Sequence, residues 1–236
     1  MGIVDFHSHV LPKMDDGSSG TGESLEMLKM MQQQGVEIVA ATPHFYAHED
    51  RPEDFLRRRG LAAERLRSAL PEGGPSVLLG AEIAYFEGLR NCRALTPLAL
   101  EGAGILLVEM PFYPWEQHML GDILQLADRI GVVPMLAHID RYPLHRAERG
   151  WLSDYVENGG LVQANADSLL HWRTEGRVFR LLRQGLIHVL GSDAHNTTVR
   201  PPRIGLAWEK IVRRAGDEGI RYILANQERF FPDNER

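Results

Sequence analysis

The sequence alternates seven short apolar runs with longer segments of helical periodicity, and this alternation constrains the fold more than any other feature. The runs are rich in β-branched residues and too short for helices, so we expect strands at 3–6, 36–41, 76–80, 104–108, 132–137, 161–164 and 187–190. The segments between them predict helices over 24–34, 52–70, 117–130, 146–158, 169–184 and 203–215. Gly131, Gly159 and Gly185 stand where three of these helices should end. Seven βα units favour a closed or nearly closed α/β barrel over an open sheet, in a single domain over 1–236.

Composition and charge exclude several classes of protein. Of the 236 residues, 44% are hydrophobic and 25% charged, as in ordinary globular domains, which excludes disorder and fibrous repeats. The net charge of −6 argues against wholesale binding to nucleic acid or anionic membrane. The apolar runs are far shorter than the roughly 20 residues that a membrane span needs, and no signal-peptide pattern is visible. We therefore expect a cytoplasmic protein without membrane insertion.

Chemically active side chains follow the predicted strands at their carboxyl ends, where barrels of this type collect their active-site residues. Six of the seven ends carry His, Asp or Glu, more often than their share of the composition would give. With one acid from the first loop, the candidate metal ligands are His7, His9, Asp16, His44, Glu82, Glu109, His138, Asp193 and His195. Taken singly, each has an ordinary alternative as a hydrogen-bonded histidine, a solvated acid or a helix cap. Gathered at one barrel mouth, they would repel one another unless cations neutralised the carboxylates.

The types of ligand narrow the choice of cation. Imidazole and carboxylate without thiolate suit manganese, iron or zinc at a hydrolytic centre better than a closed structural zinc site. Nine ligands are too many for one ion, so we expect two or three divalent ions, with a carboxylate such as Glu82 bridging two of them. A bridged pair of this kind is typical of phosphoryl transfer.

Arginines and aromatic residues near these ligands are candidates for binding a substrate. Arg141 and Arg200 each lie within five residues of a predicted ligand, and a guanidinium group binds phosphate oxygens in a bidentate manner. A salt-bridged loop arginine is the alternative for either one. The aromatic residues that would line the rim of the site are Phe45, Tyr46, Phe112 and Tyr113. Their alternative is packing within the loops.

Three other catalytic patterns are absent or incomplete. Residues 17–24 have the spacing of a phosphate-binding loop, but Glu23 replaces the lysine that must reach the phosphates. Cys92 is the only cysteine, and Leu98 stands six positions later, where a cysteine-dependent phosphatase needs arginine. No serine lies in a Gly-x-Ser-x-Gly elbow. The sequence therefore argues against nucleotide, thiolate and serine chemistry.

Six motifs lie in order along most of the chain, at residues 5–9, 15–17, 42–44, 80–83, 137–142 and 191–196, and Arg200-Pro201-Pro202 follows the last. Together they resemble the motifs of the bacterial capsular-polysaccharide type of manganese-dependent protein-tyrosine phosphatase. That family belongs to the polymerase and histidinol phosphatase (PHP) superfamily. The combination of Asp-Asp-Gly at 15–17 with His-Ile-Asp-Arg-Tyr at 138–142 is specific to this branch.

The resemblance implies a PHP-like distorted barrel of seven βα units, up to three metal ions with Mn²⁺ favoured, and a bacterial tyrosine autokinase as the phosphotyrosine substrate. These kinases govern capsular and exopolysaccharide export. The resemblance assigns one ion to His7, His9, Glu82 and Asp193, a second to Glu82, Glu109 and His138, and a third to Asp16, His44 and His195. It assigns phosphate binding to Arg141 and Arg200.

Alternative functions remain open at this stage. One is a PHP-type small-molecule phosphatase, such as a histidinol-phosphatase, or a nuclease-like phosphoesterase with the same metal centre. Another is a non-catalytic metal-binding module within a larger assembly. The intact ligand set argues against the module, and the acidic balance argues against the nuclease. The sequence leaves open the metal loaded, the phosphoprotein and the presence of a homo-oligomer.

Overall fold

Nine strands and seven α-helices alternate along residues 2–232, which the computed structural model describes apart from the side chains of residues 215 and 217–219. The strands are β1 (Ile3–Ser8), β2 (Val36–Ala41), β3 (His44–Phe45), β4 (Ser76–Leu79), β5 (Glu82–Ala84), β6 (Ile105–Glu109), β7 (Val133–Leu136), β8 (Leu161–Asn165) and β9 (Val189–Gly191). The helices are α1 (Thr21–Gln33), α2 (Pro52–Ala69), α3 (Gln117–Ile130), α4 (Arg146–Glu157), α5 (Ala166–Leu170), α6 (Glu175–Arg183) and α7 (Ile204–Phe230). Short 3₁₀ turns are η1 (Leu89–Asn91), η2 (Arg93–Leu98) and η3 (Ile139–Arg141). The ends of the domain predicted over 1–236 lie outside the described residues.

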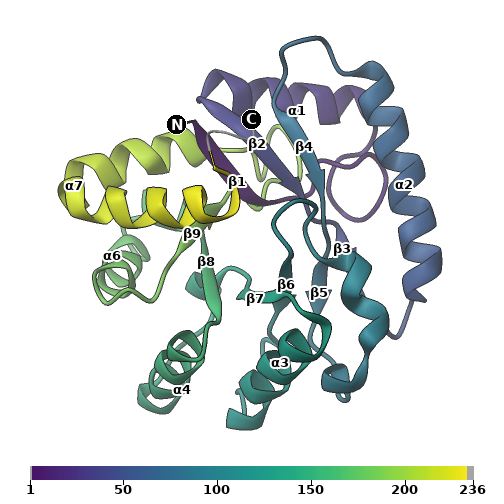
Figure 1. Cartoon of the computed structure of the whole chain (residues 1–236). Coiled ribbons are helices and arrows are strands. Elements are labelled where there is room, and N and C mark those ends of the chain that lie inside the picture. Colours follow the sequence, from purple (N-terminus) through teal and green to yellow (C-terminus); the bar gives the residue numbers. More distant parts are fainter. Residues whose placement is uncertain (1, 233–236) are drawn as a thin grey trace.

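The strands pair in parallel and curl into a distorted barrel, as predicted. One sheet has the order β1-β2-β4 and the other β3-β5-β6-β7-β8-β9. A parallel bridge between Ser8 and Ala194 joins β1 to the segment after β9. Helices lie around the outside of these strands (Figure 1). All seven predicted strands are present.

Two strands of the barrel bend, and each bend produces a short additional strand that the apolar pattern did not predict. The chain turns between β2 and β3 at Thr42 and Pro43, and between β4 and β5 at Gly80 and Ala81. A side chain at Gly80 would come within 3.3 Å of Thr42, so the two bends pack closely. Beyond the bends, β3 pairs with β5, and β5 pairs with β6.

Most predicted helices are present, but two predictions need correction. The helix predicted over 169–184 is divided into α5 and α6, because the backbone of His171 is extended and ends α5. The Thr174 hydroxyl donates a 2.6 Å hydrogen bond to the Ser168 carbonyl across the intervening turn. The helix predicted over 203–215 extends as α7 to Phe230, with an interruption at Gly216, where φ is +63°. Helical periodicity located these helices, but it did not reveal the break or the extension.

The strands position the functional site above a small apolar cluster. Ile105 and Leu107 belong to this cluster, and Glu109 lies on the same face of β6 because alternate strand residues point the same way. Phe231, just after α7, also belongs to the cluster and packs against Phe6 with ring centroids 5.8 Å apart. A larger apolar cluster packs the helices against the strands.

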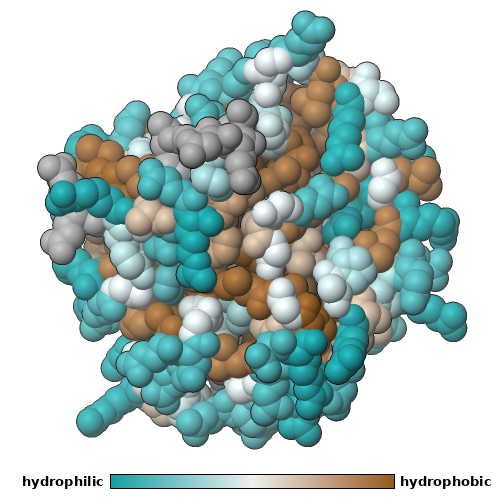
Figure 2. Space-filling view, in the orientation of Figure 1, coloured by the Kyte–Doolittle hydropathy of each residue, from teal (hydrophilic) through white to brown (hydrophobic). Residues whose placement is uncertain are grey.

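Hydrophilic residues lie around the periphery of the face drawn in Figure 2, and hydrophobic residues gather nearer its centre.

Three glycines end helices as predicted. Gly131, Gly159 and Gly185 have φ of +71°, +93° and +69°, a backbone typical of the residue that follows a helix. Within residues 2–232, no helix combines the length and apolar character needed to cross a membrane.

Candidate metal centre

The nine predicted ligands converge at the carboxyl ends of the strands. They come from β1 and the loop after it, from β3, β5 and β6, and from the segments that follow β7 and β9. Their contacts form one continuous network through Glu82 and Asp193. The side chains of His7 and His9 are fully buried, whereas that of Asp16 is 67% exposed. The cluster is therefore a buried group of ligands with one face toward solvent.

Glu82 lies at the centre of this cluster and is 1% exposed. Its Oε2 atom lies 3.2 Å from His7 Nε2, 3.3 Å from His9 Nε2 and 3.0 Å from His44 Nδ1. Its Oε1 atom lies 2.8 Å from His138 Nε2. The pairing of His44 with Glu82 across β3 and β5 explains why these two side chains meet. A carboxylate surrounded in this way is suited to bridging two cations.

Three groups of ligand atoms within this cluster are compact enough to hold an ion, with all atoms of a group within 4.8 Å of one another. The groups are His9, Asp16, His44 and His195; His7, His9 and Glu82; and His44, Glu82 and Glu109. The first contains the whole set that the resemblance implied for the third ion. The second contains most of the set implied for the first ion.

His138 and Asp193, which these groups omit, lie directly beside them. His138 Nε2 is 3.3 Å from Glu109 Oε1 in addition to its contact with Glu82. Asp193 Oδ1 is 3.5 Å from His9 Nε2. Both residues have a positive φ, +30° for His138 and +52° for Asp193. Such a backbone is uncommon for a residue with a side chain, and it turns both residues toward the cluster at the strand ends.

The cluster contains buried polar atoms without hydrogen-bond partners, and these fit the presence of cations. Glu82 Oε2, His44 Nδ1 and His195 Nε2 are buried without an aligned hydrogen bond. The Nε2 atoms of His7 and His9 face each other at 3.1 Å. Buried polar atoms are normally satisfied, and converging imidazole and carboxylate atoms are satisfied together by divalent ions.

The electrostatics of the cluster keep its central carboxylates ionised. Burial alone would raise the pKa of Glu82, but the neighbouring His7, His138 and His44 hold that pKa well below its ordinary value. Burial opposes ionisation of Asp193 as well, yet nearby histidines and an arginine hold its pKa well below the ordinary value. Ionised carboxylates are the form that binds metal ions.

The supporting residues include several that the sequence did not identify as part of the site. Asp15 Oδ2 lies 2.7 Å from His9 Nδ1 and accepts a 2.9 Å hydrogen bond from the His44 backbone N–H. Gln163 Oε1 faces His7 Nδ1 at 3.2 Å and accepts a 2.6 Å hydrogen bond from the backbone N–H of His138. Both orient imidazole rings. Their position, next to a predicted ligand or at a strand end, is a signal that could have found them.

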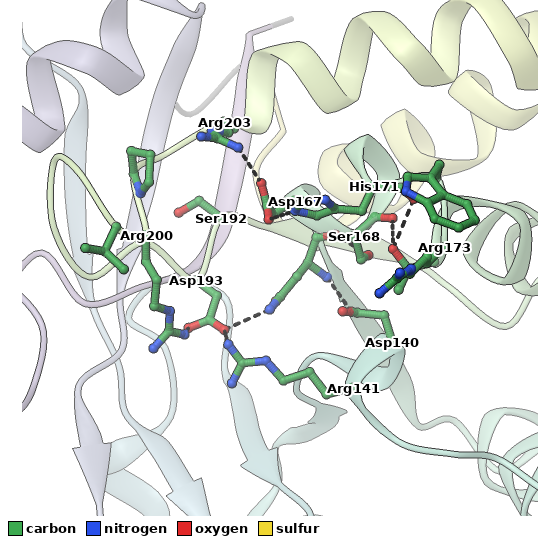
Figure 3. Close-up of a pocket in the computed structure, with 15 residues that line it drawn as sticks. Asp140, Arg141, Asp167, Ser168, His171, Arg173, Ser192, Asp193, Arg200 and Arg203 are labelled. Carbon is green, nitrogen blue, oxygen red and sulfur yellow. Dashed lines mark hydrogen bonds and ion pairs between the residues drawn. The ribbon is translucent and has the colours of Figure 1, made fainter.

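Two arginines converge on Asp193 at the edge of the cluster (Figure 3). Arg141 Nη2 donates to Asp193 Oδ2, and Arg200 Nη2 lies 2.7 Å from Asp193 Oδ1. Each arginine side chain is about one-third exposed, at 33% and 34%. Both guanidinium groups therefore lie between the ligands and solvent, where an anionic group can reach them.

The family of the chain follows from comparison with known proteins. Residues 3–231 match the family model for the capsular polysaccharide synthesis proteins CpsB/CapC. The chain belongs to this family. The tyrosine-protein phosphatase YwqE of Bacillus subtilis is 33% identical over 241 residues, which cover 99% of this chain and 92% of that protein. The tyrosine-protein phosphatase CpsB of Streptococcus agalactiae serotype V is 27% identical, over 94% of this chain and 95% of its own.

A structural comparison agrees with this CpsB/CapC assignment. The match is to the crystal structures of YwqE from Bacillus subtilis and CpsB from Streptococcus pneumoniae, unique metal-dependent tyrosine phosphatases. The TM-score is 0.81 at 26% sequence identity, and the alignment covers 97% of this chain and 94% of the matched chain. The resemblance noted in the sequence is thereby confirmed, together with the PHP-like fold.

Three of the four aromatic residues predicted to line a rim are at least partly exposed. Phe112 and Tyr113 are 65% and 59% exposed, and the ring of Phe112 is stacked 6.2 Å from that of His138. Tyr46 is half-buried and stacks on His44, with centroids 5.4 Å apart. Phe112 and Tyr46 therefore lie beside the ligands, and the exposed Tyr113 follows Phe112 in the chain.

Phe45 is not part of the rim, and its predicted role in substrate binding is wrong. It is 1% exposed and packs edge-on against Phe55, with ring centroids 5.3 Å apart. Because successive residues of a strand point to opposite faces, His44 faces the cluster and Phe45 faces the apolar core.

Proposed function

We propose that this CpsB/CapC protein is a metal-dependent protein-tyrosine phosphatase, a hydrolase that acts on phosphotyrosine of a tyrosine autokinase in capsular or exopolysaccharide biosynthesis. The observation that carries the proposal is the placement of Arg141 and Arg200 on Asp193, at the exposed edge of a buried ligand cluster centred on Glu82. The names of its relatives support the same activity.

We assign metal binding to the nine residues of the cluster and phosphate binding to the two arginines. The ligand chemistry, imidazole with carboxylate and no thiolate, supports manganese, with iron or zinc as alternatives. When bound, two or three divalent ions would stabilise charge on the phosphoryl oxygens and lower the pKa of an attacking water. Asp15 and Gln163 would hold the imidazole rings of His9 and His7 in their orientation.

The protein's own groups would bind and orient the phosphoryl ester. The guanidinium groups of Arg141 and Arg200 donate to non-bridging phosphoryl oxygens and stabilise the charge that develops there. Phe112, which stacks beside His138, and the exposed Tyr113 that follows it would give the tyrosine ring an aromatic wall. A phenolate, with a parent pKa of about 10, leaves with less protonation than a serine alkoxide requires.

The test compares four substrates under one metal loading. Purified protein is loaded with Mn²⁺ and given a phosphotyrosine peptide, the matched phosphoserine peptide, histidinol phosphate and single-stranded DNA. We expect the phosphotyrosine peptide to have the highest kcat/KM, by about ten- to a hundredfold over phosphoserine, since two aromatic contacts contribute roughly 0.5 to 1.5 kcal/mol each. Equal or better turnover of phosphoserine peptide or histidinol phosphate would replace the tyrosine assignment with a small-molecule phosphatase.

The remaining predictions concern the metal ion, the extent of the domain, the partner protein, the cellular location and the oligomeric state. Parallel loading with Mn²⁺, Fe²⁺ and Zn²⁺ identifies the preferred ion by the highest turnover per ion bound. The single domain over 1–236, the autokinase partner, the cytoplasmic location and a homo-oligomer stay predictions. Sedimentation of the purified chain would measure its oligomeric state.

A further inference from the structure

A cavity of about 500 Å³ opens beside the metal centre, on the side of β8 and β9 (Figure 3). Asp193, Arg141 and Arg200 form one part of its wall, so the cavity is continuous with the site proposed for the phosphate. The loop between α5 and α6 forms another part, with Trp172 and Arg173. A volume of this size is in the range of ligand pockets, yet a single phosphoryl group would occupy only a fraction of it.

The rim of this cavity carries the most exposed large apolar side chains among the residues whose side chains the structure describes. Trp172 is 78% exposed and Val199 is 83% exposed. Trp172 reaches this position because the chain leaves the helix after α5 and begins again at α6. Exposed aromatic and aliphatic groups at the edge of a pocket are typical of surfaces that bind another chain.

The cavity is also rich in arginine, although the whole chain carries a net charge of −6. Beyond the two arginines on Asp193, Arg203 and Arg173 line the wall. Arg203 Nη1 lies 3.1 Å from Asp167, in an ion pair that is about half exposed. Among the residues whose side chains the structure describes, no carboxylate pairs with Arg173, and its guanidinium lies over the Trp172 ring at 5.0 Å.

Resting on the proposed function, we infer that this cavity binds the peptide segment next to the phosphotyrosine and selects an acidic side chain in that segment. Arg173 and Arg203 would bind the carboxylate, while Trp172 and Val199 contact the apolar part of the segment. An exposed ion pair such as Arg203 with Asp167 is weak, so the guanidinium can also interact with a substrate carboxylate. The cavity would thus select substrates by the charge of the residues next to the phosphotyrosine, and the metal centre would hydrolyse the phosphate ester.

The experiment uses two phosphotyrosine peptides that differ only in charge, one with Glu and one with Gln at the residues flanking the phosphotyrosine. The metal-loaded wild type is compared with the double variant Arg173→Gln/Arg203→Gln. Arg65→Gln on α2 is the matched control, because Arg65 is exposed and lies outside the cavity. A minimal aryl phosphate, which has no flanking residues, reports the metal centre alone.

We expect the wild type to prefer the Glu peptide, and the double variant to lose about five- to tenfold in kcat/KM on that peptide through a higher KM. On the Gln peptide and the minimal aryl phosphate, the two proteins and the Arg65→Gln control should agree within about twofold. Raising the salt concentration should reduce the preference of the wild type, since the contacts are exposed. Trp172→Ala should raise KM for both peptides but not for the minimal substrate.

Several results would overturn the inference. An equal loss on the Glu and Gln peptides, or no loss on either, would remove the charge selection. A change of oligomeric state in Trp172→Ala, with KM unaltered, would identify the rim as a contact between copies of the chain. If the wild type hydrolyses the minimal aryl phosphate without any preference between peptides, only this inference fails. If the metal-loaded protein hydrolyses no aryl phosphate, the proposed function itself fails.

Discussion

The metal centre and the neighbouring cavity differ in how their side chains are held. His7, His9 and Glu82 are at most 1% exposed and stand on strands or directly after one. Trp172 and Val199, on the cavity rim, are 78% and 83% exposed and stand on loops. The strand pairing fixes the ligands, whereas the position of the rim depends on where helices break and loops turn.

This difference separates two tasks of the proposed enzyme. A metal centre needs several ligand atoms within a few ångströms, which neighbouring parallel strands provide at their carboxyl ends. Recognition of a peptide needs accessible groups, and loops provide them at the surface. Changes in the metal centre should therefore affect catalysis of every substrate, and changes in the rim should affect the choice among substrates.

The largest effect is expected from loss of the cations. Chelation should abolish turnover, and Glu82→Gln should lower turnover at least about a hundredfold, because an amide lacks the charge needed to bridge two ions. Elemental analysis beside a phosphotyrosine peptide assay measures both effects, with Glu64→Gln on the exposed face of α2 as the matched control. A fully active sample that holds one ion or fewer would contradict this prediction.

The next effect concerns Asp15, which supports the metal centre without belonging to the predicted ligands. Burial raises the pKa of its carboxyl, but hydrogen bonding with His9 prevails and lowers that pKa to about 2. Asp15→Asn should weaken metal affinity about ten- to a hundredfold, since the ring of His9 loses a charged partner. Metal titration followed by calorimetry measures the change, and excess Mn²⁺ should restore turnover. Affinity equal to that of an Asp54→Asn control would show that Asp15 does not orient the ligand.

A smaller effect is expected where the two regions meet, at Arg141 and Arg200. Replacing either with Lys should cut turnover of phosphotyrosine at least about tenfold, because lysine keeps the charge but loses the planar pair of donors. The metal content and the circular dichroism spectrum should stay as in the wild type, which separates this defect from loss of the ions. Wild-type rates in both Lys variants would remove these arginines from the site.

The side chains held by strands could be predicted from the sequence to a greater extent than those held by loops. The seven main strands and the convergence of their end residues could be predicted, because strand periodicity and parallel pairing determine where those side chains lie. The bends that create β3 and β5 could not, since they depend on the close packing of Gly80 against Thr42. Within the metal centre, the supporting role of Gln163 was also missed: it lies at a strand end, but its neutral amide is not among the His, Asp and Glu side chains on which the prediction of ligands was based.

The exposed residues of both regions, the aromatic residues near the ligands and those at the cavity rim, were harder to predict, because exposure is a property of the folded chain. The sequence places Phe45 and Tyr46 side by side after His44, yet one is buried and the other lies beside the ligands. The exposed Trp172 lies within a segment whose periodicity predicts one continuous helix. Its position follows from the break at His171, whose extended backbone ends α5 and which the periodicity does not reveal.

The smallest effect tests whether the exposed aromatic residue Phe112, beside the metal centre, selects the aromatic substrate. Phe112→Ala should lower the ratio of kcat/KM for phosphotyrosine over phosphoserine peptide about two- to tenfold, the worth of one aromatic contact of roughly 0.5 to 1.5 kcal/mol. Turnover of a minimal aryl phosphate should persist, because the ligands and both arginines remain. Phe45→Leu is the matched comparison: it alters a buried ring, so it should lower Tm and leave the ratio unchanged. If both variants lowered the ratio equally, selectivity would depend on the stability of the whole barrel, and the separation of rim from core would fail.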